Sequence, residues 1–206
     1  MIPPKINKMD KIYKRSGLIV IIAFIFQSIV AQIPPKDHQI IAAVQAVPEE
    51  MREGATVLGF NEDGELVTLR EGTNGMICLA DDPNRKGFNA ACYHQDLEPF
   101  MARGRELRAE GVSRNQVFET REKEVKSGKL KMPNIPATLH ILYGNDAKYD
   151  PETEKVTDAS IRYVIYIPYA TSESTGLPTS PPFPGAPWIM NPGTHTAHIM
   201  VTPPKK

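Results

Sequence analysis

Histidine and methionine side chains gather near the end of the sequence, at Met190, His195, His198 and Met200. Imidazole and thioether groups are copper ligands, and the soft sulfur favours Cu(I). If residues 195–202 form a strand, His195 and His198 point to opposite faces and cannot share one metal ion. His198 and Met200 then share a face, and Met190 can approach His195 across a turn. The pattern supports a site for copper or zinc; the alternative is ordinary strand histidines, with methionines filling gaps in the core.

A second group of reactive side chains lies at a predicted strand-to-helix junction, where Tyr93 and His94 precede Asp96 and Glu98. A histidine beside carboxylates can act as a general base or a metal ligand. Because His94 stands just before a helix N-terminus, its protonated form is disfavoured. The alternative is that Asp96 caps the helix, Glu98 complements the helix dipole and His94 is a half-exposed residue at the strand end.

Three arginines, Arg103, Arg105 and Arg108, lie in the first of two predicted surface helices. Guanidinium forks recognise carboxylate and phosphate groups. On a helix Arg105 and Arg108 share a side, whereas Arg103 is turned away. The simpler interpretation is a solvated face on which the arginines pair with Glu106 and Glu110.

Catalytic signatures are missing from the sequence. Neither a G-x-S-x-G elbow nor an S-x-x-K motif surrounds the hydroxyl-rich residues 171–175. Gly-rich phosphate loops, zinc-type Cys/His spacings and H-E-x-x-H are absent as well. The sequence therefore assigns no catalytic residue and leaves open whether the protein is an enzyme.

The first 31 residues have the layout of a secretory signal peptide. The chain starts with a basic stretch formed by Lys5, Lys8, Lys11, Lys14 and Arg15. An apolar run over residues 17–26 follows, and its length of about 10 residues is short for a membrane span of roughly 20. We expect cleavage before Gln32, which would release residues 32–206 to the periplasm or the exterior without a membrane attachment. The alternative is an uncleaved N-terminal anchor.

Two cysteines, Cys78 and Cys92, follow the predicted signal peptide. An even number of cysteines in an exported chain suggests a disulfide. The bond would close a loop of about 15 residues, worth roughly 3 kcal/mol in the chain-entropy model. In a hairpin centred on residues 81–87, Cys78 faces residue 90, and Cys92 lies one diagonal step away on the same face. A redox or metal-binding pair is the alternative, but the spacing is far from C-x-x-C.

Charge excludes one class of partner. The sequence holds 24 Lys and Arg against 24 Asp and Glu, and the predicted signal peptide contains five of the basic residues but one of the acidic ones. The remaining chain is mildly acidic and has no basic cluster. This composition argues against nucleic acid and against a polybasic membrane patch.

Hydrophobic periodicity predicts an α+β fold. Helical spacing begins at residues 37, 97 and 114, and Ser113 with Gln116 forms a capping box. Strands are expected at residues 56–60, 65–70, 76–80, 88–93, 138–143, 161–169 and 195–202. Asn74-Gly75 is a strong hairpin signal between the second and third strands. We predict a single domain over residues 32–206, with a mostly antiparallel sheet of about six or seven strands and helices packed on one face.

A long proline-rich segment at residues 170–194 interrupts this pattern and contains the single tryptophan, Trp188. Loops beyond about 12–15 residues are uncommon in compact domains and are usually functional or disordered. The sequence favours a non-catalytic binding module that uses this segment, with Trp188, Met190, Tyr166 and Tyr169 as binding residues. Its ligand, a protein or a small molecule, stays unidentified. The alternative is a copper-type Met/His protein or a small exported metal-dependent enzyme.

Overall fold

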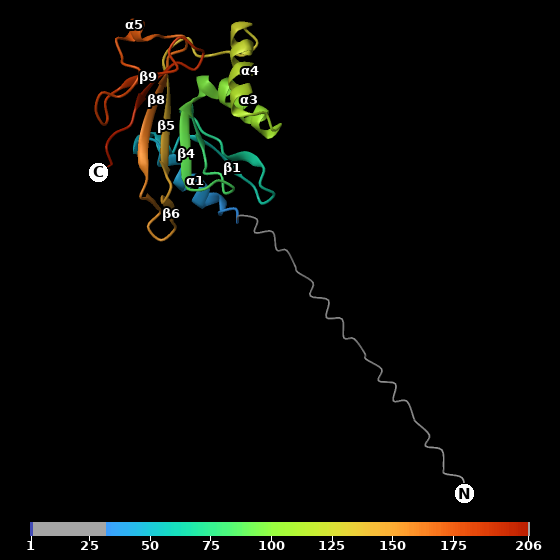
Figure 1. Ribbon diagram of the computed structural model, residues 1–206. Helices are drawn as coiled ribbons and strands as arrows, with labels where there is room; N and C mark the ends of the chain where they lie inside the picture. The colour runs from blue at the N-terminus through green and yellow to red at the C-terminus, as the bar shows by residue number, and fades with distance from the viewer. Residues whose placement is uncertain (2–31, 206) are drawn as a thin grey trace. The chain divides into compact units, whose positions relative to one another are not determined.

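The computed structural model describes Met1 and residues 32–205, and contacts group residues 31–206 into one unit. The predicted signal peptide therefore lies, apart from Met1, outside the described residues. Eight strands form the main sheet: β1 (Thr56–Phe60), β2 (Leu66–Arg70), β3 (Met76–Leu79), β4 (Phe88–His94), β5 (Ala137–Gly144), β8 (Ser160–Tyr166), β9 (Trp188–Met190) and β10 (His198–Val201). Their order is β2-β1-β3-β4-β5-β8-β10-β9 (Figure 1). Strands β6 (Lys148–Asp150) and β7 (Lys155–Thr157) form a separate hairpin.

The α+β class and the mostly antiparallel sheet are confirmed, with eight strands where six or seven were expected. One pairing differs from the sequence prediction, because β3 pairs parallel with β1 and forms no hairpin with β2. Residues 72–75 instead carry the chain past the start of β1. Thr73 donates a backbone hydrogen bond to Gly54 at 2.7 Å, and a side chain at Gly72 would collide with the backbone of Thr56. The glycine permits this crossing, which local turn signals do not reveal.

Helices lie on both faces of the sheet, where one face was expected. Helix α1 (Lys36–Val44) packs through Ala43 on the face that carries Cys92. The next residue, Tyr93, points to the opposite face, where it packs against Leu97 of the 3-10 turn η1 (Gln95–Leu97). Helix α3 (Glu98–Ala109) continues from this turn, and α4 (Arg114–Lys126) packs against α3 (Figure 1). The two short helices are α2 (Glu49–Arg52) and α5 (Ser172–Thr175).

Local capping explains several helix boundaries. The Ser113 hydroxyl donates to the side-chain oxygen of Gln116 at 2.7 Å, so the predicted start of α4 is confirmed. Asp96 does not cap α3 as expected, because α3 begins after Leu97 and Asp96 lies in the preceding turn η1, which His94 caps by accepting the Asp96 N–H at 3.3 Å. Helix α1 begins one residue before the expected start at 37, after Pro35, and Asp37 lies in its first turn, where its charge complements the helix dipole.

A disulfide joins Cys78 to Cys92, as the sequence predicted. The two residues are direct partners in the β3–β4 register, with Cα atoms 3.9 Å apart. The sequence placed Cys78 opposite residue 90, with Cys92 on a diagonal, and this register is wrong because Cys78 lies directly opposite Cys92. Both cysteines are fully buried under α1, so the bond crosses the core on that face.

Residues 170–194 form more than a loop. They contain α5 and the edge strand β9, and the Ile189 N–H donates to the carbonyl of Pro178 at 2.9 Å. The last strand begins at His198 and not at His195, because residues 191–197 form turns. Among the helices of residues 32–205, none has both the length and the apolar character needed to cross a membrane.

Candidate functional site

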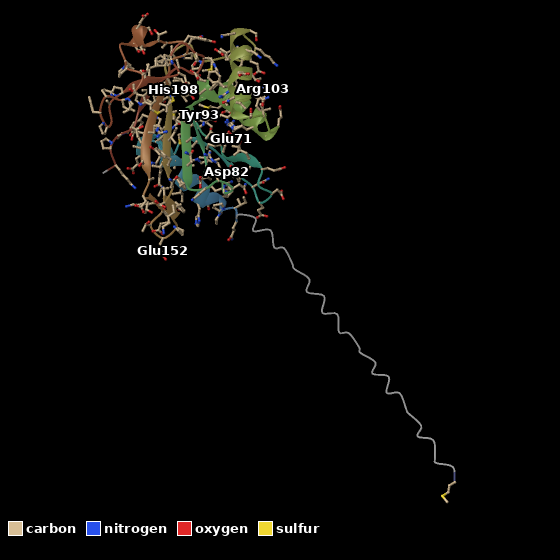
Figure 2. The ribbon with its side chains drawn as sticks, viewed as in Figure 1. Glu71, Asp82, Tyr93, Arg103, Glu152 and His198 are labelled. Carbon is tan, nitrogen blue, oxygen red and sulfur yellow. A yellow bond between two sulfur atoms is a disulfide. The ribbon has the colours of Figure 1, made fainter. Side chains whose placement is uncertain are left out.

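A cavity of about 300 Å³ lies between the α3–α4 pair and the ends of β8, β9 and β10. We call it the arginine pocket. Its lining residues are Arg108, Arg114, Val117, Phe118, Arg121, Tyr166, Met190, Asn191, Thr196 and His198. Figure 2 shows His198 at the end of the sheet where Figure 1 shows α3 and α4. The cavity thus joins residues from the middle of the chain to residues near its end.

Strand register assembles the floor of the pocket. His198 is the direct partner of Tyr166 on β8 and of Met190 on β9, so the three side chains lie on one face of the sheet. The His198 and Tyr166 rings are 5.3 Å apart between centroids. The sequence predicted Tyr166 and Met190 as binding residues and His198 as a metal ligand. The structure brings these three residues together.

A glycine makes room for the arginines on the wall. Nη1 of Arg121 donates to the Phe100 carbonyl at 3.1 Å, and the guanidinium carbon lies 3.8 Å from the Phe100 ring centroid. A Cβ atom at Gly104 would lie 2.8 Å from Nη1 of Arg121 and 3.5 Å from Nη1 of Arg108. Both guanidinium groups therefore converge over the one position of α3 that carries no side chain.

The positive charge of the pocket has no carboxylate partner. Its lining includes neither Asp nor Glu, and the ion pairs found in the described part of the chain leave out Arg108, Arg114 and Arg121. The Nε atom of Arg121 is buried without a hydrogen-bond partner among residues 32–205. Burial, reinforced by the positive charge of Arg108, lowers the pKa of Arg121 to about 10. A bound anion would supply the missing counter-charge.

Two buried histidines stand at the pocket. His198 lines it and donates through Nδ1 to the Thr196 carbonyl at 2.7 Å, which leaves Nε2 as the acceptor in the neutral ring. Burial lowers the pKa of His198. His195 is 0% exposed and lies behind the lining, with its ring centroid 4.8 Å from Phe118 and 5.7 Å from Phe100. Burial lowers the pKa of His195 to about 4, so this ring is neutral at pH 7.

Of the predicted histidine and methionine ligands, His198, Met190 and Met200 lie on one face of the sheet, and His195 lies before β10. His195 precedes β10, so the expectation that His195 and His198 occupy one strand is wrong. His198 and Met200 do share a face, because they are two residues apart on β10. Within residues 32–205, no group of three His, Cys, Asp or Glu side chains is placed to hold a metal ion. The copper or zinc hypothesis stays a prediction, which titration with Cu(I) and Zn(II) would test.

The side chains at 93–98 separate into two contacts. His94 Nδ1 lies 3.4 Å from the Asp96 carboxylate at the surface. On the opposite face, the Tyr93 hydroxyl donates to Glu98 at 2.6 Å, and Arg105 donates to both groups at 2.8 and 2.6 Å. Burial and the Glu98 carboxylate raise the pKa of Tyr93. This network ties the end of β4 to α3, and His94 and Asp96 lie outside it.

The remaining predicted binding residues lie outside the pocket. Trp188 packs partly against the core cluster that contains Met200, and it also lines a proline-rich cavity of about 400 Å³. Tyr169 is exposed, has a φ of 63° and lines an open groove of about 750 Å³. Of the four predicted binding residues, Tyr166 and Met190 therefore belong to the arginine pocket.

Sequence reasoning missed Arg114 and Arg121, although a signal for them exists. Arg114, Phe118 and Arg121 are spaced by four and three residues, which places them on one side of α4. Gly104 is the matching signal, because a glycine inside a helix is destabilising by roughly 0.5–1 kcal/mol relative to alanine. Together these positions show where arginine side chains of α3 and α4 lie beside each other over Gly104.

Comparison with known proteins yields no relative: no family model, no curated protein and no solved structure matches the chain.

Proposed function

We propose that this chain is a non-catalytic binding module whose arginine pocket holds a small anion with phosphate or carboxylate groups. One observation carries the proposal: three arginines line a single cavity that has no acidic residue in its wall. Arg108 and Arg114 are exposed, whereas Arg121 is partly buried and its Nε has no hydrogen-bond partner among residues 32–205. A partly buried charge without a counter-ion is destabilising, so Arg121, with two further guanidinium groups at the same cavity, supports an anionic ligand.

The lining has the chemistry to orient such a ligand. Guanidinium groups present rigid forks of N–H donors that match the oxygens of carboxylate and phosphate. The hydroxyl of Tyr166 and the amide of Asn191 add neutral polar groups, and Phe118 supplies an apolar wall. A cavity of about 300 Å³ is at the small end of ligand sites, which indicates a small molecule.

The proline-rich segment has a place in this proposal. It contributes Met190 and Asn191 to the pocket, and Trp188 helps to hold β9 against the core. Asn191 has a φ of 52°, a conformation that asparagine tolerates, and it donates to the Thr196 hydroxyl at 3.2 Å. The segment therefore forms the rim of the pocket at the sheet edge.

We also propose that the protein acts in an oxidising compartment outside the cytosol. The Cys78–Cys92 disulfide supports this location, because structural disulfides persist mainly in exported proteins. The predicted signal peptide supports it independently, and N-terminal sequencing of the protein recovered after export would show whether cleavage precedes Gln32.

An NMR titration tests the binding function. The purified protein at low ionic strength would receive inorganic phosphate, citrate, glycerol or ethanolamine in turn. We expect saturable amide shifts around Arg121, Thr196 and His198 with phosphate or citrate, and none with glycerol or ethanolamine. The stronger of the two anions identifies the ligand class. Absence of saturable shifts with both anions, or shifts spread over the whole surface, would contradict the proposal.

A further inference from the structure

A second cavity, of about 340 Å³, lies between α1 and the β6–β7 hairpin. We call it the hairpin cavity. Its lining residues are Pro34, His38, Gln39, Ala42, Asp81, Phe88, Ala147, Lys148, Tyr149 and Pro151. Figure 2 shows Glu152, the neighbour of Pro151, at the end of the sheet away from His198. The hairpin cavity is thus separate from the arginine pocket.

The wall area of this cavity is mainly apolar, and five of its residues carry polar groups: His38, Gln39, Asp81, Lys148 and Tyr149. Asp81 accepts the Asn89 N–H at 2.8 Å through Oδ1, and its carboxylate takes part in no ion pair within residues 32–205. The Tyr149 hydroxyl is buried and has no hydrogen-bond partner within residues 32–205. The His38 ring lies 5.3 Å from the Tyr149 ring, so the two form an aromatic side of the cavity.

Gln39, another polar residue of the wall, already has hydrogen-bond partners. Its amide donates to the carbonyls of Pro34 and Phe60 and accepts the Phe60 N–H, all within 2.9 Å. These contacts tie α1 to the end of β1. The open polar groups are therefore concentrated at Asp81 and Tyr149.

Acidic groups dominate the charge around these two residues. Ion pairs in the described part of the chain do not include Asp81. Burial and, to a smaller extent, the charge of Asp82 raise the pKa of Asp81 to about 6, although the Asn89 hydrogen bond and Arg85 oppose the shift. Burial together with the charges of Glu154 and Asp150 raises the pKa of the Tyr149 hydroxyl. Lys148 is the one basic residue of the lining, and its side chain is exposed.

We propose that the hairpin cavity binds a small molecule with an apolar body and one protonated amine. The ammonium group donates to the Asp81 carboxylate and to the Tyr149 oxygen, which gives the carboxylate a counter-ion and the hydroxyl a hydrogen-bond partner. The apolar body packs against Phe88, Ala42 and Ala147, beside the rings of His38 and Tyr149. Specificity follows from charge: an amine supplies the counter-ion that Asp81 lacks, whereas an acid of the same shape would meet a carboxylate.

Three probes of one shape and different charge test this proposal: benzylamine, benzyl alcohol and benzoate, each titrated into the purified protein at pH 7.5 and followed by NMR. For a molecule of this size we expect a Kd of about millimolar for benzylamine. Benzyl alcohol is expected to bind at least fivefold more weakly, and benzoate to give no saturable shifts in the cavity. Shifts should centre on Asp81, Phe88 and Tyr149.

A matched pair of variants assigns the binding to the carboxylate. Asp81→Asn keeps the acceptor for the Asn89 N–H and should weaken benzylamine at least fivefold while leaving benzyl alcohol unchanged. Asp82→Asn, the control at the next position, removes an equal charge outside the lining and should weaken benzylamine less than twofold while leaving benzyl alcohol unchanged. Tyr149→Phe gives a second test that should weaken benzylamine about threefold.

Three results would overturn the proposal: no saturable binding of benzylamine, equal affinities for benzylamine and benzyl alcohol, or benzylamine affinity that Asp81→Asn leaves intact. If Asp81→Asn failed to fold, the probe comparison on the unmodified protein and the Tyr149→Phe variant would still decide. Tighter binding of benzoate would assign the cavity to acids instead.

Discussion

The α3–α4 pair carries two kinds of arginine. Arg103 and Arg105 reach carboxylates, with Arg103 2.9 Å from Glu124 and Arg105 2.6 Å from Glu98. Arg121, from the same pair of helices, instead stacks on Phe100 and lines a cavity. The residue type is identical, so the difference lies in the partner: a carboxylate for Arg103 and Arg105, and an aromatic ring with a backbone carbonyl for Arg121.

The comparison shows where the protein retains unfavourable features. Arg121 is partly buried with an unpartnered Nε, and Gly104 weakens the helix beside it. The paired side shows neither feature, because the Tyr93–Glu98–Arg105 network satisfies its own polar groups. Unfavourable features that coincide at one cavity point to a function there.

The largest effect is expected at His195, which lies beside the unpaired arginine. Its folded pKa of about 4 is below the ordinary value of 6.5, so between these values the unfolded chain binds a proton that the folded chain does not. The free energy of unfolding must therefore fall as pH falls from 6.5 to 4, by about 3 kcal/mol from this residue. In urea denaturation across this pH range, the His195→Leu variant should lack this decrease in the free energy of unfolding.

Asp81→Asn provides a control of the opposite sign. The pKa of Asp81 rises from 3.8 to about 6 on folding, so its contribution is present at low pH and is lost as pH rises through 6. A His195→Leu variant with the same pH dependence as the unmodified protein would show that His195 is not held neutral by burial.

The next largest effect is expected from a variant that breaks the Tyr93–Glu98–Arg105 network. Arg105→Met leaves the Glu98 carboxylate and the Tyr93 hydroxyl without their shared donor, and it should lower the free energy of unfolding by about 2 kcal/mol. Anion binding should remain within about threefold of the unmodified protein. Equilibrium urea unfolding measures the first quantity, and a stability equal to that of the unmodified protein would remove the structural role of the network.

A smaller effect is expected from a substitution beside Arg121, the arginine without a carboxylate partner. Gly104→Ala introduces a Cβ 2.8 Å from Nη1 of Arg121, and that flexible guanidinium must move away. Because alanine favours helix more than glycine, stability should rise by up to about 1 kcal/mol. Phosphate or citrate affinity should fall several-fold in calorimetry. A stabilised variant with unchanged affinity would show that the position of Arg121 over Gly104 is irrelevant to binding.

Much of the fold could be predicted from the sequence, because alternating apolar residues and the Ser113 cap are local signals. The disulfide also followed from local evidence, since one short loop separates the cysteines. The parallel β1–β3 pairing did not, because it depends on a crossing at Gly72 that no local pattern encodes. The division of helices between the two faces is likewise set by packing over the whole sheet.

The site was less predictable than the fold. Tyr166, Met190 and His198 were singled out separately, but their common face results from pairing among three strands that are distant in sequence. Arg121 was missed because its significance depends on a glycine 17 positions earlier, on another helix. Arg108 was grouped with Arg103 and Arg105, since spacing on one helix does not show which arginines find carboxylates.

Isothermal titration of phosphate and citrate into the unmodified protein, Arg121→Met and Arg105→Met tests the central claim most directly. We predict that Arg121→Met weakens the preferred anion at least tenfold, about 1.4 kcal/mol, without loss of stability. Arg105→Met should lose stability and keep the anion. Equal losses of affinity in the two variants, or no saturable binding of either anion to the unmodified protein, would contradict the assignment of the arginine pocket as an anion site.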